Sequence, residues 1–192
     1  MESERYKGSL AVGLLHYPML DGQGDIVATN ITNFDIHDIA RACRVYGVER
    51  YYLIHPMREQ LMFVERILDH WRVGTGAKHN PKRRTALTMV KTAENLESAL
   101  RDWGSPSPWI VATHPRPVSG AASISFRELR EALWSGQSVF LMFGTGFGMP
   151  DDFMRKCTRV LEGIRGVPPD DYRHLSVRSA VSICLDRLCG QW

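Results

Sequence analysis

The chain has 192 residues, of which 44% are hydrophobic and 23% charged, and its formal net charge at pH 7 is +3. These values are typical of a soluble globular protein with a single domain, which we expect to span residues 1–192. No apolar run approaches the length of a membrane span, and the polar N-terminus lacks a signal-peptide pattern. The composition therefore excludes a membrane partner and favours a cytoplasmic protein.

The predicted elements alternate between strand and helix from the start of the chain. A short apolar run at residues 10–15 predicts the first strand, and apolar residues at helical spacing over residues 35–46 predict the first helix. Gly47 follows the end of that helix, as is common at this position, and Asp35 or Asn33 can cap its start. Residues 51–55 predict the second strand, and an amphipathic second helix follows it.

Residues 74–84 predict a loop that carries concentrated positive charge. Four basic side chains lie within seven residues, so the rest of the chain has almost no net charge. This concentration suits an anionic partner such as nucleic acid, although a solvated surface loop would look the same. The charge pattern alone leaves both interpretations open. The four residues are Lys78, Lys82, Arg83 and Arg84.

The second half of the chain continues the alternation. Residues 87–91 and 109–113 predict strands, and residues 94–103 predict a helix between them. A capping box at residues 125–128 begins a further helix, and Ser176 caps a last helix with an apolar stripe. The alternation implies an α/β fold, a parallel sheet flanked by helices on both faces.

The most informative stretch covers residues 138–149, with the sequence SVFLMFGTGFGM. Its continuous apolar run predicts a strand buried on both faces, and it leads into a loop with glycine at alternate positions. Such glycines let the backbone approach a ligand closely, and ligands bind at this end of the strands in open α/β sheets. A tight strand-to-helix turn without a ligand is the alternative. The spacing and the late position do not match a dinucleotide-binding fingerprint.

Two more loops are expected at the same edge of the sheet, over residues 113–117 and 164–176. Together with the glycine loop they would form a deep cleft walled mainly by main chain, which suits an adenosine-type cofactor. The four cysteines show no C-x-x-C pairing, so we expect free thiols and no bound metal.

Three ordered motifs resemble the SPOUT superfamily of RNA methyltransferases. They are residues 35–41 (DIHDIAR), the glycine loop followed by residues 164–166 (IRG), and residues 174–180 (HLSVRSA). The chain from Leu10 to Gly190 resembles, more narrowly, a small bacterial family of S-adenosylmethionine-dependent RNA methyltransferases. The resemblance implies methyl transfer from S-adenosylmethionine to a tRNA or rRNA nucleotide, at the ribose or the base. It also implies a C-terminal trefoil knot and a homodimer.

The resemblance also assigns residues to roles. Arg41 matches an arginine that assists deprotonation of the 2′-hydroxyl in the ribose-methylating branch, and Asp35 stands where that branch usually has asparagine. Asp35 is thus either a general base or a helix cap, and Arg178 pairs with a carboxylate or contacts RNA. The basic segment would bind RNA. The cofactor would contact Thr113, His114, Phe143, Gly144, Thr145, Gly146, Gly148, Ile164, Arg165, Leu175 and Ser176.

Two other functions fit the same sequence. A non-catalytic module could bind RNA or a nucleotide in this cleft, with Asp35 marking lost chemistry. Methylation of a protein or a small molecule is the second alternative, which the basic segment disfavours.

Overall fold

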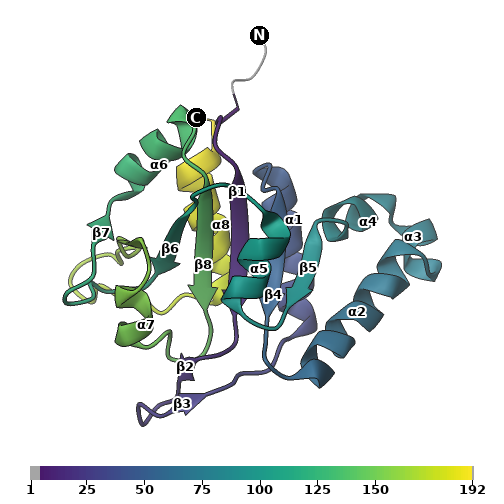
Figure 1. The fold of residues 1–192 in the computed structure, drawn as a ribbon, viewed down its shortest axis with the longest axis horizontal. Helices are drawn as coiled ribbons and strands as arrows, with labels where there is room; N and C mark the ends of the chain where they lie inside the picture. The colour runs from purple at the N-terminus through teal and green to yellow at the C-terminus, as the bar shows by residue number, and fades with distance from the viewer. Residues whose placement is uncertain (1–4, 192) are drawn as a thin grey trace.

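A computed structural model describes residues 5–191, apart from the side chain of Ala77. Its centre is a seven-stranded parallel sheet with the strand order β5-β4-β1-β8-β6-β9-β7 (Figure 1). A separate antiparallel pair, β2 and β3, lies beyond the end of β1. The strands are β1 (Leu10–Leu15), β2 (Met19–Leu20), β3 (Ile26–Val27), β4 (Arg50–Ile54), β5 (Val90–Ala93), β6 (Trp109–Thr113), β7 (Ser123–Ile124), β8 (Val139–Gly144) and β9 (Arg159–Leu161).

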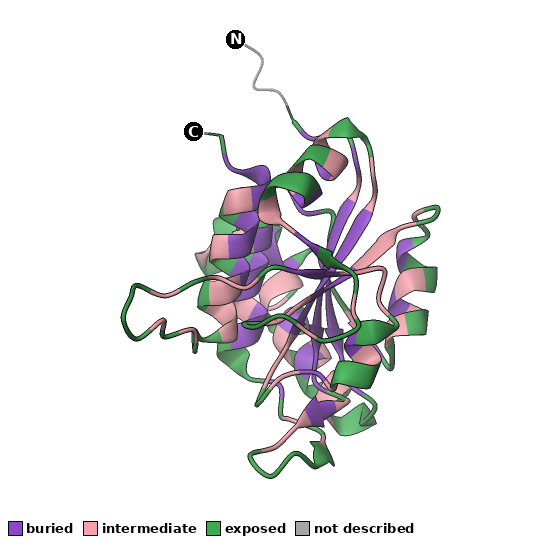
Figure 2. Ribbon diagram, turned by 90° about the vertical axis from the view of Figure 1, so that its left-hand side faces the viewer, coloured by how far each residue is buried: buried purple, intermediate pink, exposed green. Residues whose placement is uncertain are grey.

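Helices cover both faces of this sheet, as predicted, and divide the buried residues into two cores (Figures 1 and 2). Helices α5 and α7 pack on one face, and η1, α1, α2, α4, α6 and α8 pack on the other. The helices are η1 (Asp35–Ile39), α1 (Ala40–Val45), α2 (Arg58–Arg72), α3 (Thr75–His79), α4 (Pro81–Leu87), α5 (Leu96–Trp103), α6 (Phe126–Ser135), α7 (Asp151–Arg155) and α8 (Val177–Cys189).

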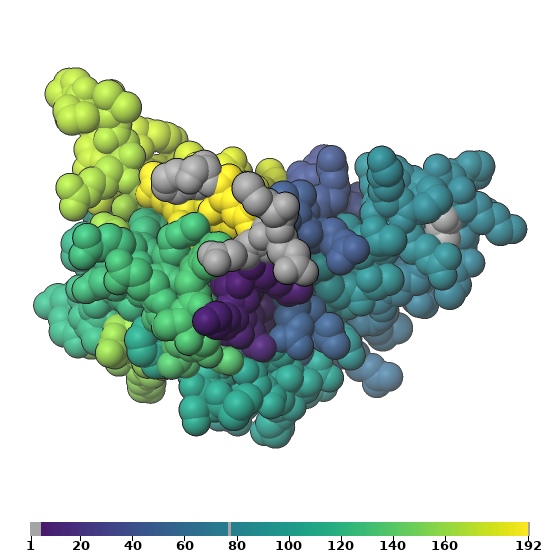
Figure 3. All heavy atoms as spheres, turned by 90° about the horizontal axis from the view of Figure 1, so that it is seen from above, coloured from purple at the N-terminus to yellow at the C-terminus, as the bar shows by residue number. Residues whose placement is uncertain are grey.

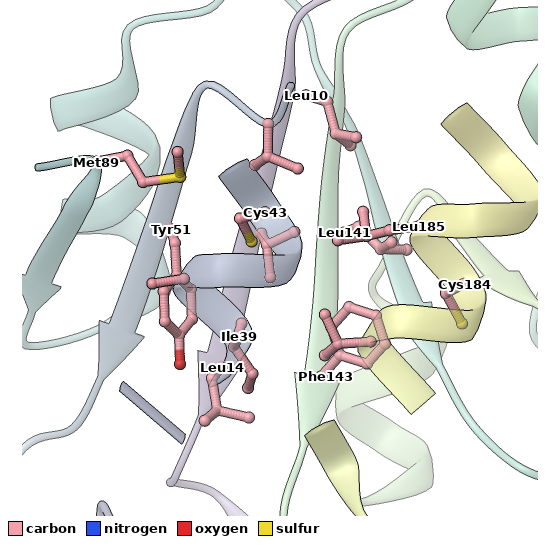
Figure 4. Packing of buried hydrophobic residues seen from close by; sticks show 14 of the residues in the cluster. Leu10, Leu14, Ile39, Cys43, Tyr51, Met89, Leu141, Phe143, Cys184 and Leu185 are labelled. Atoms are coloured by element: carbon pink, nitrogen blue, oxygen red, sulfur yellow. The ribbon is translucent and has the colours of Figure 1, made fainter. Parts of the chain in front are cut away.

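The central strands are buried on both faces because their side chains alternate between the two cores. In β1, Leu14 points to the core under α1 and α8, whereas Leu15 points to the core under α5. Figure 4 shows the larger core, where Phe143 of β8 and Cys184 of α8 face one another. Such burial on both faces explains why these strands read as uninterrupted apolar runs in the sequence.

The strand order reverses between the neighbouring strands β1 and β8, which is the topological switch point of the sheet. From β1 the chain proceeds outward through β4 to β5, then crosses to the other half and returns through β8. Helix α8 finally packs against β8, α6, α1 and η1. The carboxyl ends of β6, β8 and β9 therefore meet at one edge of the sheet, beside the start of α8. This is the part of an open α/β sheet where ligands bind.

The predicted loop at residues 74–84 is wrong, because the segment folds as the helices α3 and α4. Asn80 caps α4 by accepting a hydrogen bond from the Arg83 amide at 3.0 Å, and Pro81 takes the first helical position. The strand predicted at residues 87–91 lies instead at β5, and β7 and β9 had no predicted counterpart. Helices α2 to α4 form one end of the molecule (Figure 3).

The four cysteines are free thiols, and three of them are buried. Within residues 5–191, no helix is both long and apolar enough to cross a membrane. In the same part of the chain, no group of three or more His, Cys, Asp or Glu side chains is placed to hold a metal ion.

Candidate active site

A cavity of about 550 Å³ opens at the carboxyl ends of β6, β8 and β9 and beside the first turns of α8. Its volume lies within the range of small-molecule sites in proteins. The wall is mostly apolar and includes much glycine backbone. It is formed by Thr113, His114, Pro115, Phe143, Gly144, Thr145, Gly146, Phe147, Gly148, Leu161, Glu162, Gly163, Ile164, Arg173, His174, Leu175, Ser176, Val177, Ala180 and Cys184.

The glycine loop after β8 is held in place by the short strand β2. The Leu20 amide donates to the Gly148 carbonyl oxygen at 2.9 Å, and the Leu20 carbonyl accepts from the Phe147 amide at 3.2 Å. Gly146 and Gly148 have φ angles of 56° and 101°, which side-chain-bearing residues rarely adopt. The loop thus presents its backbone to the cavity in a fixed shape.

The segment 162–176 forms the facing wall and projects beyond it (Figure 3). Arg173 ties this segment to the loop after β6, since its Nη1 donates to the Pro115 carbonyl oxygen at 2.9 Å. Asp171 accepts from the Gly166 amide at 2.9 Å and forms an ion pair with Arg173. These contacts hold two sequence-distant loops against each other around the cavity.

Helix α8 supplies the deep part of the wall. Ser176 caps the helix, as predicted, by accepting from the Ser179 amide at 3.2 Å. Ala180 and Cys184 belong to the predicted apolar stripe, yet they face the cavity as well as the core. Burial raises the pKa of the Cys184 thiol to about 12, so this wall stays uncharged.

The structure brings nearly all of the predicted cofactor residues together around this cavity. Arg165 is the exception, because its exposed side chain does not line the wall. Sequence reasoning missed Leu161, Glu162 and Gly163, which follow the unpredicted strand β9. The apolar stripe of α8 was the available signal for Ala180 and Cys184, but a stripe does not distinguish a core from a cavity wall.

Asp35 and Arg41 lie outside the cavity wall, on the helix that η1 and α1 form together. Both carboxylate oxygens of Asp35 have partners: Oδ2 accepts from the Thr32 hydroxyl at 2.6 Å, and Oδ1 from Arg178 Nη1 at 2.9 Å. Thr32 Oγ1 in turn accepts from the Asp35 amide at 3.3 Å. The Thr32 amide also donates to Asp35 Oδ2, at 3.3 Å, which completes a capping box: Thr32 is the cap of a helical turn that begins at Asn33, and Asp35 is its third residue.

Arg178 joins the start of α8 to this helix. Its Nε lies 3.9 Å from Asp38 Oδ2, and Asp38 Oδ1 lies 3.9 Å from Arg41 Nη1. Asp35 is only 4% exposed, whereas Arg41 and Asp38 are exposed. Two arginines and two aspartates thus form a chain of ion pairs between η1, α1 and the first turn of α8, where Ser176 and Val177 line the cavity.

A partly buried network of hydrogen bonds connects His16 and Thr29 to Thr145 of the glycine loop. His16 Nδ1 lies 2.9 Å from Thr29 Oγ1, which in turn lies 2.5 Å from Thr145 Oγ1 on the cavity wall. Among the described residues, His16 Nε2 has no hydrogen-bond partner. Burial lowers the pKa of His16 to about 4, reinforced by His55 and opposed by Asp35. The imidazole is therefore neutral at neutral pH.

This neutral state predicts that the protein loses stability in acid through His16. The unfolded chain binds a proton near pH 6.5 and the folded chain only near pH 4, so the free energy of unfolding falls as the pH decreases across this interval. We expect His16 to contribute about 3 kcal/mol to this fall, and His16→Gln to lack that contribution. Urea unfolding at a series of pH values measures both slopes. Equal slopes in the two proteins would contradict the prediction.

The predicted RNA-binding residues lie together on α3 and α4. Lys78, Lys82 and Arg84 are exposed, and none of the four basic residues forms an ion pair with any described residue. The Arg83 guanidinium lies 4.8 Å from the centre of the Trp71 ring. Trp71 is partly buried against the larger core, and the centre of its ring lies 5.4 Å from that of His37 in a T-shaped arrangement. Helix α4 thus lies beside η1 and α1, with which it is in contact.

The structure is an open α/β fold with a glycine-rich cavity at the carboxyl ends of β6, β8 and β9. Residues 9–190 match the model of a family described as SAM-dependent RNA methyltransferase. The chain belongs to this family. The family description gives S-adenosylmethionine as the cofactor, in agreement with the cofactor that we expected from the sequence.

Two relatives illustrate the extent of the match. A tRNA (guanine-N(1)-)-methyltransferase of Oleidesulfovibrio alaskensis is 36% identical over 98% of this chain, but only 44% of that protein is covered. The chain thus spans less than half the length of the curated relatives of this name that it matches. An uncharacterized protein of Aquifex aeolicus is also 36% identical, over 92% of this chain and 86% of its own.

Solved structures confirm the fold. A putative methylase family protein from Neisseria gonorrhoeae has a TM-score of 0.62 at 20% identity, over 97% of this chain and 84% of that one. An AdoMet-bound rRNA methyltransferase from Sinorhizobium meliloti has a TM-score of 0.54 at 17% identity, over 96% and 57%. The A. aeolicus TrmH/SpoU tRNA modifying enzyme has a TM-score of 0.52 at 17% identity, over 96% and 75%. The resemblance to the SPOUT superfamily is therefore confirmed at the level of the fold.

Proposed function

We propose that this protein transfers a methyl group from S-adenosylmethionine to a nucleotide of RNA. The observation that carries the proposal is the cavity at the carboxyl ends of β6, β8 and β9, whose wall is glycine backbone and apolar side chains. Such a wall suits a ligand with a flat aromatic ring and a polar chain, because apolar side chains can contact the faces of the ring while exposed amides and carbonyls bind the polar parts. Family membership supplies the reaction class.

The residues around the cavity fit this cofactor. The backbone of the glycine loop and of Gly163 would bind its polar groups, and Phe143, Ala180 and Cys184 would contact the faces of its adenine ring. Arg165 has no part in this arrangement. When bound, the cofactor supplies a methyl group that is already electrophilic, so the protein has only to orient the acceptor and accommodate its proton.

Arg41 is the charged group that we assign to the acceptor, because its side chain is exposed and its one ion pair with a described residue is the 3.9 Å contact to Asp38. Asp35 is assigned to positioning, because both of its oxygens are already bound. The acceptor atom is not inferred from the guanine-N(1) name of the longer relatives, since this chain matches less than half of them. We further propose a homodimer with a trefoil knot, which light scattering and a solved structure would test.

Two measurements separate this function from the alternatives. Calorimetry with S-adenosylmethionine tests the cofactor, and transfer of a labelled methyl group to RNA from cells that lack the protein tests catalysis. Binding of the cofactor without transfer to RNA would favour the non-catalytic module. Transfer to protein in the same lysate, but not to RNA, would favour the other alternative. Mass spectrometry of the labelled RNA then identifies the nucleotide and the acceptor atom.

From the basic residues of α3 and α4, which we call the basic helices, we predict a salt-dependent contribution to RNA binding. Each phosphate contact contributes roughly 0.9 to the slope of log K against log salt on double strands. We expect Arg84→Glu to weaken binding of bulk tRNA and to reduce this slope by about one or more, with the cofactor affinity unchanged. The matched control is Arg101→Glu, an exposed arginine of α5 on the opposite face of the sheet. The same slope in both variants would exclude the basic helices as an RNA contact.

A further inference from the structure

The exposed ring of Phe34 has no role in either core. Phe34 is 68% exposed, although it lies in the first turn of a helix whose other apolar residues, such as Ile36 and Ile39, are fully buried. The Arg178 guanidinium lies 5.7 Å from the centre of its ring. An exposed aromatic ring beside an arginine resembles a binding surface more than a folding element, because packing gains nothing from this position.

The arginine beside Phe34 is held by two carboxylates. The Asp35 and Asp38 carboxylates hold the Arg178 side chain, at 2.9 and 3.9 Å. Arg178 is the residue after Val177, which belongs to the cavity wall. Phe34 thus contacts, through Arg178, the first turn of α8, whose residues Ser176 and Val177 line the cavity.

On its other side, the helix that carries Phe34 is connected to α3 and α4 by a line of aromatic and cationic side chains. His37, one helical turn further along, has its ring centre 5.4 Å from that of Trp71, and Trp71 is covered by Arg83 at 4.8 Å. Helix α4 packs against both η1 and α1, which places the positive charges of α3 and α4 at the end of this line (Figure 1).

We propose that Phe34 is a stacking platform for an unpaired nucleobase of the RNA substrate, with Arg178 at its edge. This inference rests on the proposed function. It adds how the protein would hold the part of the RNA that contains the methyl acceptor. Single-stranded RNA is bound through aromatic rings that stack on bases and through cations that follow the backbone, which are the two features of this surface. The nucleotide on Phe34, or the one next to it, enters the cavity.

The positive charge of α3 and α4 favours RNA over a second copy of the chain as the occupant. Arg41 and Arg178 are paired with Asp38 and Asp35, whereas the four basic residues of α3 and α4 form no ion pair with any described residue. The phosphates of RNA would neutralise these unpaired charges, whereas a symmetric contact between two copies would bring like charges together.

The test compares Phe34→Ala with Phe34→Tyr, which keeps the aromatic face. We expect Phe34→Ala to raise the KM for RNA roughly 5- to 100-fold, with unchanged affinity for S-adenosylmethionine, and Phe34→Tyr to restore most of the loss. The control is Phe63→Ala, the same change at a partly exposed phenylalanine of α2. A single-stranded RNA oligonucleotide containing 2-aminopurine reports stacking directly, since its fluorescence is quenched by stacking whether or not methyl transfer occurs.

The outcomes distinguish a failure of the stacking role of Phe34 from a failure of the proposed methyltransferase function. Quenching that is equal in wild type and Phe34→Ala overturns the platform, even if the enzyme methylates RNA. Quenching that Phe34→Ala abolishes supports the platform, even if the chosen RNA receives no methyl group. If light scattering shows that Phe34→Ala dissociates a dimer, Phe34 belongs to an interface between copies and the inference is wrong.

Discussion

Replacing Gly163 with alanine is expected to weaken the binding of S-adenosylmethionine by roughly 10- to 100-fold, because separating two walls of its cavity would lose one or two hydrogen bonds of about 1.4 kcal/mol each. A Cβ atom at Gly163 would lie 2.2 Å from the Pro115 carbonyl oxygen and 2.7 Å from its carbonyl carbon. These are backbone atoms, so no side-chain rotation relieves the overlap. The segment after β9 and the loop after β6 must separate, and both of them line the cavity.

Gly8 provides a control with the same steric problem at a different place. A Cβ atom there would lie 2.1 Å from the Gln137 carbonyl oxygen and 2.9 Å from that of Leu133. None of these three residues lines the cavity. We expect both variants to lose about 2–4 kcal/mol of stability, and only Gly163→Ala to lose cofactor affinity. Thermal unfolding and calorimetry below both melting temperatures measure the two quantities.

Equal cofactor affinity in Gly163→Ala and wild type would place the cofactor elsewhere in the fold. A parallel loss of affinity in Gly8→Ala would mean that general destabilisation, and not the shape of the cavity, determines binding. The comparison therefore tests the position of the cofactor without an assay of methyl transfer.

The glycine loop was predictable from the sequence because its signals are local. An apolar run followed by alternate glycines is contained within residues 138–149, and the parallel sheet follows from repeated strand and helix patterns. The cap at Ser176 and the capping box at residues 125–128 are local for the same reason, and both are present.

Strand β9 was not predictable, because a three-residue strand is defined by its partners. It pairs with β6 on one side and β7 on the other, and the sequence RVL indicates neither pairing. Gly163 was missed with it. The helices α3 and α4 are different, because Asn80 and Pro81 form a recognisable helix start that the concentration of positive charge obscured.

The role of Asp35 could not be decided from the sequence, since its main partner lies far along the chain. Arg178 is 143 residues away and reaches Asp35 only because α8 packs against η1. The capping partner Thr32 lies close in the sequence. A Thr-x-x-Asp pattern, however, only indicates the start of a helix and does not exclude a role for Asp35 as a general base. The structure adds that no oxygen of Asp35 is left without a partner.

We expect Asp35→Ala to lower the free energy of unfolding by about 3 kcal/mol. The substitution removes the partner of Arg178 and the acceptor of the Thr32 hydroxyl together, and truncating one member of a largely buried ion pair costs about 3–5 kcal/mol. The lower value applies here because the Arg178 side chain is 35% exposed. Urea unfolding measures the change. Asp38→Ala, which removes an exposed carboxylate from the same helix, should cost less than about 1 kcal/mol.

Asp35→Asn distinguishes a positioning residue from a general base. Asparagine keeps an oxygen for the Thr32 hydroxyl and a similar volume, but it cannot take up a proton. If Asp35 positions Arg178 and the helix, the rate of methyl transfer in a single turnover should fall less than about tenfold, and its pH profile should keep its shape. If Asp35 is the base, the rate falls by roughly 100-fold or more while the fold is retained. Only the first result is consistent with a carboxylate whose two oxygens are already bound.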